Sequence, residues 1–445
     1  MQEKSLGVRM FFVGLIGLAL IIPLFMVYGL VGDRQHQARV AQESIAAGWA
    51  GPQVIVGPIL VIPYIHETTV TEEVDGKTTT RTVERRRNLY LAPESQNSAA
   101  DIDPDVKTRS IYQSVIYSAS LSGKAEFAMP DDLSGLGVGS SEILLDQAEI
   151  RLGMSDPRGL QSDASLKVAG KAIVLKPGNG PASGEGAGMH ALFDWSQEQP
   201  LTVEWSYSLR GSSSFSFAPL GKSTDWTVRS QWQHPSFSGS FLPDAGTVQD
   251  SGEGFDAKWS ISNLALGQST ITKQDPSGQV DDVATIRLME PVDVYSQVDR
   301  AVKYAFLFIG FTFLVFFMFD AVGGVRVSAP EYLLTGAGLV LFFVLLLAFA
   351  EVVGFTAAYA IASGAIIGLL TAYSAAVLSS WKRAKLIAAL LVGLYGLLYV
   401  LLSLEAYSLL LGSVMLFFVL AGVMYATRGV DWSAVNRQPN EEALA

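Results

Sequence analysis

The feature that most constrains this chain is the grouping of its apolar residues into long unbroken runs. A helix needs roughly 20 predominantly apolar residues to cross the hydrocarbon core of a bilayer. Runs of about that length occur at 10–31, 303–319, 332–350, 353–378, 386–402 and 406–426. The sequence therefore predicts a membrane α-helical bundle of six transmembrane helices, with one helix before a long polar insert and five after it.

The polar insert runs from Gly32 to Arg300 and has 269 residues. That length is enough for one large domain or two small ones, each with its own core. The insert contains 22 Lys and Arg against 34 Asp and Glu, a net charge of −12, whereas the rest of the chain carries +1. An acidic domain repels nucleic acid and no basic stripe offsets this charge, so we expect no nucleic-acid partner.

Lys and Arg in short flanking segments mark the cytoplasmic side of a membrane protein. If the predicted helices cross in alternation, all such residues lie on one side, and the connections around Glu351 and Glu405 have none. The residues concerned are Lys4, Arg9, Arg326, Lys382, Arg383, Lys385, Arg428 and Arg437. We therefore predict a cytoplasmic N-terminus (1–9), a cytoplasmic C-terminal tail (427–445) and an insert outside the cytoplasm, which in a bacterium is the periplasm.

The first apolar run is interpreted as a retained anchor. Its length of about 22 residues exceeds the ~7–15 of a signal-peptide core, and no A-x-A-like cleavage site follows directly. Cleavage would instead leave five spans and an exterior N-terminus. The chain has no cysteine, so the insert must be held by its own core, and thiol catalysis and thiolate metal sites are excluded.

Within the insert, short stretches rich in Val, Ile and Thr alternate with Gly and Pro, a pattern typical of strands. The predicted strands are 106–129, 142–152, 165–176, 200–211, 223–233, 254–263 and 283–292. By the period of two, Trp226, Val228 and Ser230 share one face. We therefore predict an all-β, sandwich-like domain over 32–300, in which only the Ala-rich residues 34–50 extend the first helix.

Two Thr- and Val-rich arms flank Asp75-Gly76, a pair typical of a tight hairpin turn. That turn places His66 opposite Arg85 and sets the acidic pair 72–73 against threonines. The segment before it, 50–65, has Gly-Pro and Pro breaks and suits an edge strand or the entry to a sheet. Further along, the glycine-rich segment 176–188 is predicted to be a mobile loop.

The stretch QWQHPSFSGSFLP (231–243) gathers polar and aromatic residues. It and the following Asp244 supply the residue types of a hydrolase triad, yet positions so close in one extended chain seldom converge, and no G-x-S-x-G elbow occurs. We favour a strand closed by Trp232, a break at His234-Pro235 and a turn at 238–240 pinned by Phe237, Phe241 and Leu242. The stretch also forms a candidate recognition surface, made of His234, Pro235, Ser236, Phe237, Gly239, Phe241 and Pro243.

Three other patterns carry weaker signals. Residues 101–105 (DIDPD) begin like a calcium loop but lack its Gly and Glu at positions 6 and 12, which favours a solvated loop. The run Arg85–Arg87 suits a lipid headgroup or an anionic polymer, but its place opposite acidic residues favours an ordinary charged sheet edge. The four histidines are too scattered for a metal motif, so we expect no metal, cofactor or catalytic residue.

Inside the predicted helices the absences are informative. Ionisable residues fall only at helix ends, at Lys303, Asp320, Glu351 and Glu405. Because transporters and proton pumps usually carry such residues within their spans, ion-coupled transport is disfavoured. The pattern Gly364-x-x-x-Gly368 permits close helix packing and indicates a compact bundle.

The chain resembles the CreD family of bacterial inner-membrane proteins over nearly its whole length. The resemblance is carried by GPQVIVGPILVIPY, LYLAPE, SIYQSVIYSASLSGKAEF, HPSFSGSFLP, GFDAKW and RGVDW, together with the order of one anchor, a long insert and five closing spans. It implies an association with cell-envelope integrity and with an envelope- or nutrient-stress response. It brings no reaction, cofactor or catalytic residue with it.

These observations favour a non-enzymatic inner-membrane protein whose helices lie in the lipid bilayer. Its periplasmic β-domain would contact an envelope protein or an envelope polymer. One alternative is lipid or envelope-precursor handling by the membrane bundle, for which a groove lined by Tyr373, Tyr395 and Tyr399 is expected. Another is a membrane-tethered periplasmic hydrolase, which predicts that His234→Ala loses function while the protein stays folded.

Overall fold

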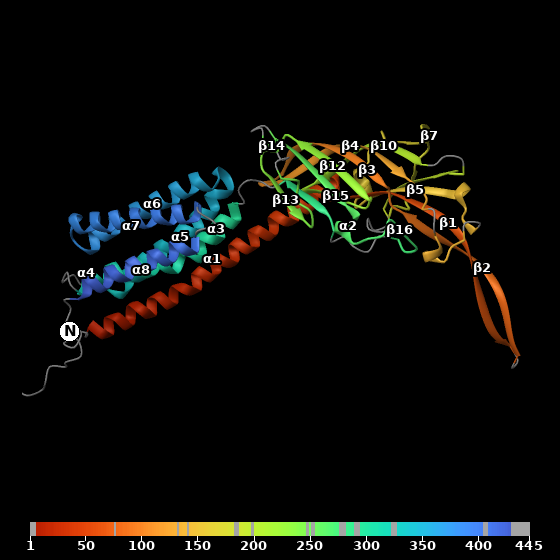
Figure 1. Ribbon diagram of the computed structural model, residues 1–445. Coiled ribbons are helices and arrows are strands. Elements are labelled where there is room, and N and C mark those ends of the chain that lie inside the picture. The colour runs from red at the N-terminus through yellow and green to blue at the C-terminus, as the bar shows by residue number, and fades with distance from the viewer. Residues whose placement is uncertain are drawn as a thin grey trace, which may run out of the picture. The chain divides into compact units, whose positions relative to one another are not determined.

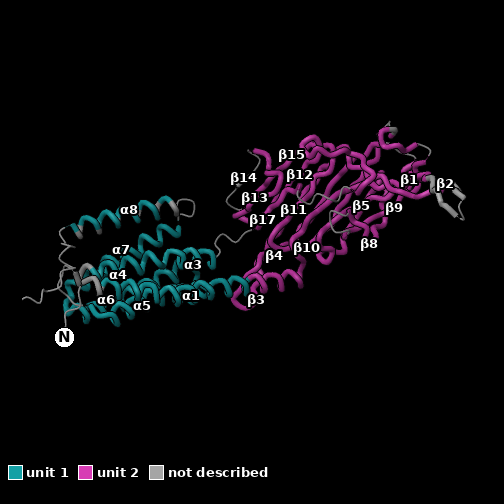
Figure 2. Tube along the Cα trace, turned by 90° about the horizontal axis from the view of Figure 1, so that it is seen from below, with its two compact units in different colours: residues 1–38, 292–445 teal, residues 39–291 magenta. Residues whose placement is uncertain are grey.

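Figure 1 shows the computed structural model of the chain. It describes residues 6–74, 77–130, 133–139, 142–181, 187–196, 200–245, 249–250, 254–275, 282–288, 294–321, 327–403 and 408–428. The chain divides into two compact units (Figure 2). Residues 1–38 and 292–445 form the first, which is helical, and residues 39–291 form the second, which is built mainly of strands.

Each predicted apolar run falls on a helix. The helices are α1 (Leu6–Trp49), α3 (Val294–Lys303), α4 (Ala305–Ala321), α5 (Ala329–Val353), α6 (Phe355–Val377), α7 (Trp381–Ser403) and α8 (Ser408–Thr427). Of these, α3, which precedes the run 303–319, was not predicted. The extension of α1 to Trp49 confirms that the Ala-rich residues 34–50 continue the first helix. Residues 6–38 of α1 belong to the first unit and its remaining residues to the second.

In the described part of the chain, four helices are long and apolar enough to cross a membrane: α1, α5, α6 and α7. The pair α3–α4, bent by 41° at a short break, makes a fifth if it is one broken span. The described residues therefore contain several helices with the length and composition of membrane spans. The predicted total of six, which requires α8, stays a prediction.

The first unit has its own apolar core, centred on the aromatic side chains of α5, α6 and α7. Phe342 lies 4.6 Å from Tyr395 and 5.5 Å from Tyr359, measured between ring centroids. The hydroxyl of Tyr359 donates to the Tyr395 carbonyl at 2.6 Å, which satisfies a polar group that would otherwise be buried without a partner.

The expectation for Gly364 and Gly368 is wrong. A Cβ added at either glycine meets nothing within 4 Å, so neither lies at a helix contact among the described residues. The buried face of α6 is offset from them and carries Ala358, Ala362, Ile366 and Leu370. Close packing occurs instead at Gly336 in α5, where a Cβ would lie 2.1 Å from a methyl carbon of Leu20 in α1.

The second unit contains two sheets. Its strands are β1 (Gln53–Val74), β2 (Lys77–Leu91), β3 (Ser95–Arg109), β4 (Tyr112–Phe127), β5 (Ala148–Met154), β6 (Ser165–Val168), β7 (Lys171–Ile173), β8 (Lys176–Pro177), β9 (Gly188–Phe193), β10 (Leu201–Ser212), β11 (Ser214–Ala218), β12 (Ser223–Ser230), β13 (Pro235–Gly239), β14 (Gln249–Asp250), β15 (Phe255–Ser262), β16 (Ile271–Thr272) and β17 (Ala284–Leu288). Its only described helices are short: η1 (Ser134–Leu136), η3 (Leu145–Gln147), η4 (Pro157–Gly159) and α2 (Asn263–Leu266).

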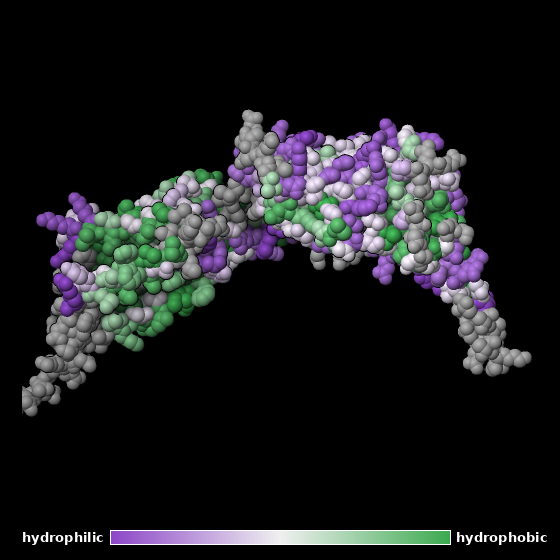
Figure 3. Space-filling view, viewed as in Figure 1, coloured by the Kyte–Doolittle hydropathy of each residue, from purple (hydrophilic) through white to green (hydrophobic). Residues whose placement is uncertain are grey.

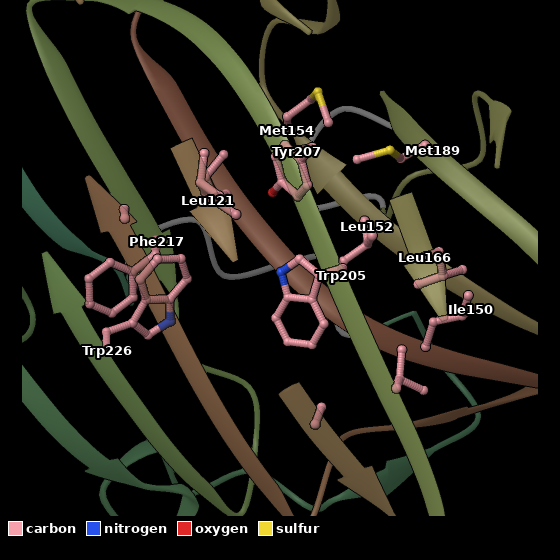
Figure 4. Packing of buried hydrophobic residues seen from close by; sticks show 14 of the residues in the cluster. Leu121, Ile150, Leu152, Met154, Leu166, Met189, Trp205, Tyr207, Phe217 and Trp226 are labelled. Atoms are coloured by element: carbon pink, nitrogen blue, oxygen red, sulfur yellow. The ribbon is translucent and has the colours of Figure 1, made fainter. Parts of the chain in front are cut away.

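The nine-stranded sheet follows the order β13-β17-β11-β1-β5-β9-β8, with β2 added to β1 and β16 to β2. The eight-stranded sheet follows the order β14-β15-β12-β3-β4-β10-β6-β7. The inner faces of both sheets contribute to one apolar cluster (Figure 4). At its centre, the ring of Phe217 from the first sheet stacks on Trp226 from the second, with 4.4 Å between centroids. One core shared by two sheets makes the unit a single sandwich domain.

The chain enters this unit through α1 residues 39–49, which are tied to the sandwich. The Trp49 indole donates to the Tyr117 carbonyl at 3.2 Å and lies under the Arg210 guanidinium. Just after the helix, the Gly51 amide donates to the Asp156 carboxylate at 2.9 Å. Asp156 also binds the side chain of Arg158, chiefly through hydrogen bonds, and these contacts lower its pKa to about 2.

Two strand expectations are wrong. Residues 101–105 are part of β3 and not a loop, because their aspartates alternate outward with Ile102 buried. For the segment 50–65 the edge-strand alternative is wrong, since β1 pairs with β11 on one side and β5 on the other, whereas the alternative of an entry to a sheet fits, because β1 is the first strand after α1. Pro58 in β1 falls at a register shift, between the residues that pair with β11 and those that pair with β2. Because no ladder hydrogen bond is needed there, the missing N–H of proline is tolerated.

The hairpin register is confirmed. His66 pairs with Arg85, and Glu72 and Glu73 pair with threonines, while the turn 75–76 itself lies outside the described residues. Arg85–Arg87 do not oppose acidic residues, however, because their partners are His66, Ile65 and Tyr64. In the segment 176–188, residues 176–177 and 188 belong to β8 and β9, and 182–186 lie outside the described residues.

Candidate functional site

The outer face of the eight-stranded sheet is hollowed by a row of small side chains. Because side chains alternate along each strand, the registers bring five outward-facing residues into one line across five strands. They are Thr227 of β12, Ala99 of β3, Ser122 of β4, Ser206 of β10 and Ser165 of β6. With ~4.8 Å between neighbouring strands, the line is about 19 Å long. We call this row the trough.

The trough is bounded on one side by longer side chains. The next row along the strands consists of Asp225, Asn97, Lys124, Glu204 and Lys167. Both rows line a hollow of about 560 Å³. A floor of serine, threonine and alanine beside a wall of charged groups therefore explains why this face is concave.

The floor and wall present hydrogen-bonding groups of both kinds. The hydroxyls of Ser165 and Ser206 lie 2.9 Å apart, and the Ser260 hydroxyl donates to Asp225. The Lys124 side chain is 51% exposed, and its ammonium nitrogen lies 3.1 Å from a carboxylate oxygen of Glu126. Hydroxyls donate and accept, so this surface suits an extended polar ligand such as a peptide segment or a polysaccharide.

A second hollow of about 690 Å³ lies on the side of the trough opposite to the charged row. Asp101, Ser120, Arg229 and Asp256 come from four neighbouring strands and line it. The Arg229 guanidinium donates to Asp256 at 3.0 Å, and this hydrogen bond raises the pKa of Arg229. The two hollows lie side by side on the outer face and are both lined by polar and charged residues.

Beneath the trough lies the core. Gly123 in β4 pairs with Trp205 in β10 and faces the sandwich interior, where a Cβ would lie 2.2 Å from the Trp205 ring. The absence of a side chain at this position lets the indole lie flat between the sheets (Figure 4). The floor of the trough is therefore the back of a closely packed layer and has little freedom to move.

The stretch 234–243 lies elsewhere, on the nine-stranded sheet. The expected turn at 238–240 is wrong in part, because residues 235–239 form β13, the strand at the end of that sheet's order. Phe237 packs edge-on against Phe255 and Trp259, and Phe241 contacts the same core, as expected. Leu242 is 63% exposed and does not pin the segment to the core.

The backbone of β13 has an open side. The Ser240 amide donates to the Val283 carbonyl at 2.9 Å, so the ladder alternation turns the backbone groups of Ser236 and Ser238 toward β17. Those of Phe237 and Gly239 then point away from β17, where no described strand pairs with them. His234 and Gly239 are exposed and Pro235, Ser236 and Pro243 half-buried. Recognition by this surface stays a prediction.

Two of the residues that supply the triad types are attached to different sheets. Ser236 pairs with Arg287 in the nine-stranded sheet, whereas the Asp244 amide donates to the Lys258 carbonyl in the other. Among the residues that the structure describes, no group of three or more His, Asp and Glu side chains is arranged to hold a metal ion.

The first unit does not contain the expected tyrosine groove. Tyr395 is buried at 2% exposure within the aromatic cluster, and Tyr399 packs on Tyr359. Tyr373 lies near the other end of α6, fourteen residues from Tyr359. A different apolar groove of about 460 Å³ lies between α1 and α4, where Gly14, Gly17 and Gly310 leave space.

Nearly the whole chain matches one protein family. Residues 5–433 match the family model described as "Inner membrane protein CreD". The inner membrane protein CreD of Escherichia coli strain K12 is 34% identical over 427 residues, which cover 94% of this chain and 91% of that protein. The chain belongs to the CreD family. The resemblance found in its sequence motifs is thereby confirmed, and so is its class as an inner membrane protein.

Solved structures add no further argument about this CreD family member. A putative protease from Parabacteroides distasonis is 9% identical, covers 54% of this chain and 53% of its own, and superposes with a TM-score of 0.22. A score of that size supports no inference about fold or activity.

Sequence reasoning missed the trough. Its five residues come from segments between 99 and 227 and contain no motif, so only the strand registers bring them into line. The available signal was the alternation of small polar residues in 118–122 and 206–208, which indicates one solvent-facing side of each strand.

Proposed function

We propose that this protein is a non-enzymatic inner-membrane protein that supports cell-envelope integrity. In this proposal six helices anchor it, both termini are cytoplasmic, and the sandwich domain lies in the periplasm. There the trough binds an envelope component, either a segment of an envelope protein or an envelope polymer. The observation that carries the proposal is the concave row of small residues across five strands, four of them hydroxyl-bearing, bordered by charged groups.

Two features support binding over chemistry. The trough offers many weak hydrogen-bonding groups spread over about 19 Å, which suits an extended ligand. Its serines lie beside other serines, threonine and alanine, without a neighbouring histidine that would act as a base. A binding face of this kind tolerates loss of any single hydroxyl but not loss of its concave shape.

The test is to fill the trough without disturbing the core. Ser122→Phe and Ser206→Phe place large side chains on adjacent exposed positions of the floor. We expect each variant to be present at normal levels but to fail to restore resistance to detergents and bulky antibiotics in cells that lack the protein. Leu192→Phe is the control, because Leu192 is 52% exposed on β9, which belongs to the nine-stranded sheet and not to the sheet that carries the trough.

A site-specific photocrosslinker at residue 122 in intact cells should then link to an envelope component that is absent when the crosslinker is at residue 192. Full restoration of resistance by both trough-filling variants would contradict the proposal.

A second candidate function is lipid or envelope-precursor handling by the helices. The apolar groove between α1 and α4 favours it, because the groove is open at Gly14, Gly17 and Gly310 and is lined otherwise by apolar side chains. Gly17→Leu with Gly310→Leu should fill the groove. If this function holds, the purified variant loses a co-purifying lipid that the wild type retains, and envelope resistance falls while the trough stays intact.

A hydrolase function makes a separate prediction. His234 is exposed next to β13, so its replacement leaves the fold unchanged. If His234→Ala abolishes envelope resistance in an abundant, folded protein, the non-enzymatic proposal is wrong. Unchanged resistance would argue against a hydrolase that uses His234 as its general base.

A further inference from the structure

The hairpin of β1 and β2 continues beyond the sandwich as a free ribbon. We call residues 66–74 and 77–85 the arm; they form nine successive pairs. β5 pairs with β1 no further than Val61, and β16 pairs with β2 only at 90–91. Among the described strands, each side of the arm therefore has only the other as partner. Nine residues at ~3.4 Å each give a length of about 30 Å.

The arm leaves the domain at a defined place. In Figure 1 it projects from the end of the second unit opposite to α1 residues 39–49, through which the chain enters. An isolated two-stranded ribbon is only marginally stable in water. A ribbon of this length that packs on no other described strand is therefore expected to serve as a contact surface.

The two faces of the arm differ in charge. Register and the period of two put cross-strand partners on the same face. One face, which we call the basic face, has His66, Thr68, Arg81, Val83, Arg85 and Arg87 among the residues whose side chains are described. The opposite face has Ile65, Glu67, Thr82, Glu84 and Arg86. Three arginines thus share one face of an otherwise acidic domain, with no acidic residue among the described side chains of that face; the register places Glu72 further along it.

These arginines have no counterion among the described side chains. Arg81, Arg85 and Arg87 are exposed, and none forms an ion pair with a described residue. Elsewhere in the domain, Arg151, Arg158 and Arg229 each pair with a carboxylate. The basic face is therefore the described surface of the domain on which unneutralised positive charge gathers, and it fits an anionic partner.

The spacing of the row indicates what kind of anion it meets. Arg81 and Arg85 are about 14 Å apart along the strand, and Arg85 and Arg87 about 7 Å. A folded acidic protein would have to match this uneven spacing, whereas a plane of closely repeated phosphates meets it in any register. Arginine pairs with phosphate oxygens through parallel hydrogen bonds, and valine and threonine between the arginines keep the face flat.

We propose that the basic face of the arm docks on an anionic phospholipid surface. Basic residues close to such a surface each strengthen binding about fivefold at moderate ionic strength. The contact is separate from the trough, so failure of either proposal leaves the other standing.

The experiment uses the full chain in nanodiscs of phosphatidylcholine, so that any anionic lipid comes only from added vesicles. Capture of phosphatidylcholine vesicles with and without phosphatidylglycerol is measured by co-flotation. We expect capture to require phosphatidylglycerol, to fall about 30-fold in Arg85→Gln with Arg87→Gln, and to vanish at high salt, because the screening length shortens. Melting temperature confirms that the exposed substitutions leave the fold intact.

The matched control is Arg86→Gln with Lys171→Gln, which removes two exposed positive charges outside the basic face. It should capture vesicles like the wild type. Arg85→Lys with Arg87→Lys should also keep most capture, because a lipid surface responds mainly to charge.

Three results would overturn the proposal. One is equal capture of vesicles with and without phosphatidylglycerol. Another is an equal loss in the two glutamine pairs. The third is binding of a soluble anionic polysaccharide or acidic protein through Arg85 and Arg87 without vesicle capture, which would assign the basic face to a different partner.

Discussion

The helical unit and the sandwich distribute apolar surface in opposite ways (Figure 3). In the sandwich, Trp226, Phe217 and Trp259 are buried at 3% exposure or less and the outer faces are polar. In the helical unit, large apolar side chains face outward, with Phe25 at 70% and Met26 at 72% exposure. An apolar exterior is stable only in lipid and a polar one only in water. The difference indicates that the helical unit is suited to lipid and the sandwich to water.

Charged side chains of the described helical unit lie outside the apolar stretches of its helices. Glu351 lies in the last turn of α5, where its carboxylate is 3.7 Å from Arg34 and accepts a hydrogen bond from Tyr295 at 3.3 Å. In the sandwich the charged pairs lie on the surface, as with Lys222 and Glu94 at 2.7 Å. Charged residues therefore lie at the ends of apolar helix segments in the helical unit, whereas in the sandwich they form part of the solvated surface.

The strongest test of this contrast compares two aromatic truncations. Trp226→Ala removes a ring stacked on Phe217 in the sandwich core and should lower the free energy of unfolding by about 3–5 kcal/mol. Phe25→Ala removes an outward-facing ring of α1 and should change it by less than about 0.5 kcal/mol in a lipid-like environment. Pulse proteolysis of the full chain in detergent measures both, and equal losses would break the comparison.

A smaller effect separates two glycines. Gly123→Ala pushes a methyl group into the Trp205 ring, and we expect a loss of about 1–3 kcal/mol. Gly364→Ala meets empty space on the outside of α6 and replaces a poor helix former, so a gain of up to about 1 kcal/mol is expected. Denaturant midpoints of the two variants test this. A destabilising Gly364→Ala would indicate that Gly364 does lie at a helix contact.

The smallest expected effect is at the point where the chain enters the sandwich. Asp156 has its pKa lowered from 3.8 to about 2, first by hydrogen bonds from Arg158 and then by those from backbone amides. A lowered pKa stabilises the fold above about pH 4, and the gain is lost as pH falls through 2. Because Arg158 is 64% exposed, we expect only about 1 kcal/mol.

Thermal unfolding of Asp156→Asn and the wild type checks this titration. The two should differ at pH 7 and converge as the pH is lowered toward 2. A difference that stays constant over this range would show that the carboxylate's charge contributes nothing.

The sequence predicted the features that depend on local pattern. Apolar run length located the helices, and the Asp75-Gly76 turn set a hairpin register that holds for fifteen pairs. The Ala-rich segment after the first run continued its helix as expected, because no Gly or Pro interrupts residues 34–47.

Features that depend on distant pairing could not be predicted. The aspartates of 101–105 suggested a loop by composition, yet β4 and β12 pair on both sides of them and hold them in a sheet. Pro235 suggested a break but begins an edge strand, a position that tolerates proline. The trough and the basic face exist only because registers align residues from separate strands, information that no single stretch contains.

The account depends most on the second unit lying outside the cytoplasm, and the absence of cysteine makes this directly measurable. Ala172→Cys puts a single thiol on the exposed β7, and Lys382→Cys puts one at the start of α7. A membrane-impermeant maleimide added to cells with a permeabilised outer membrane should label residue 172 at once and residue 382 only after the inner membrane is opened. Labelling in the reverse order would contradict the account.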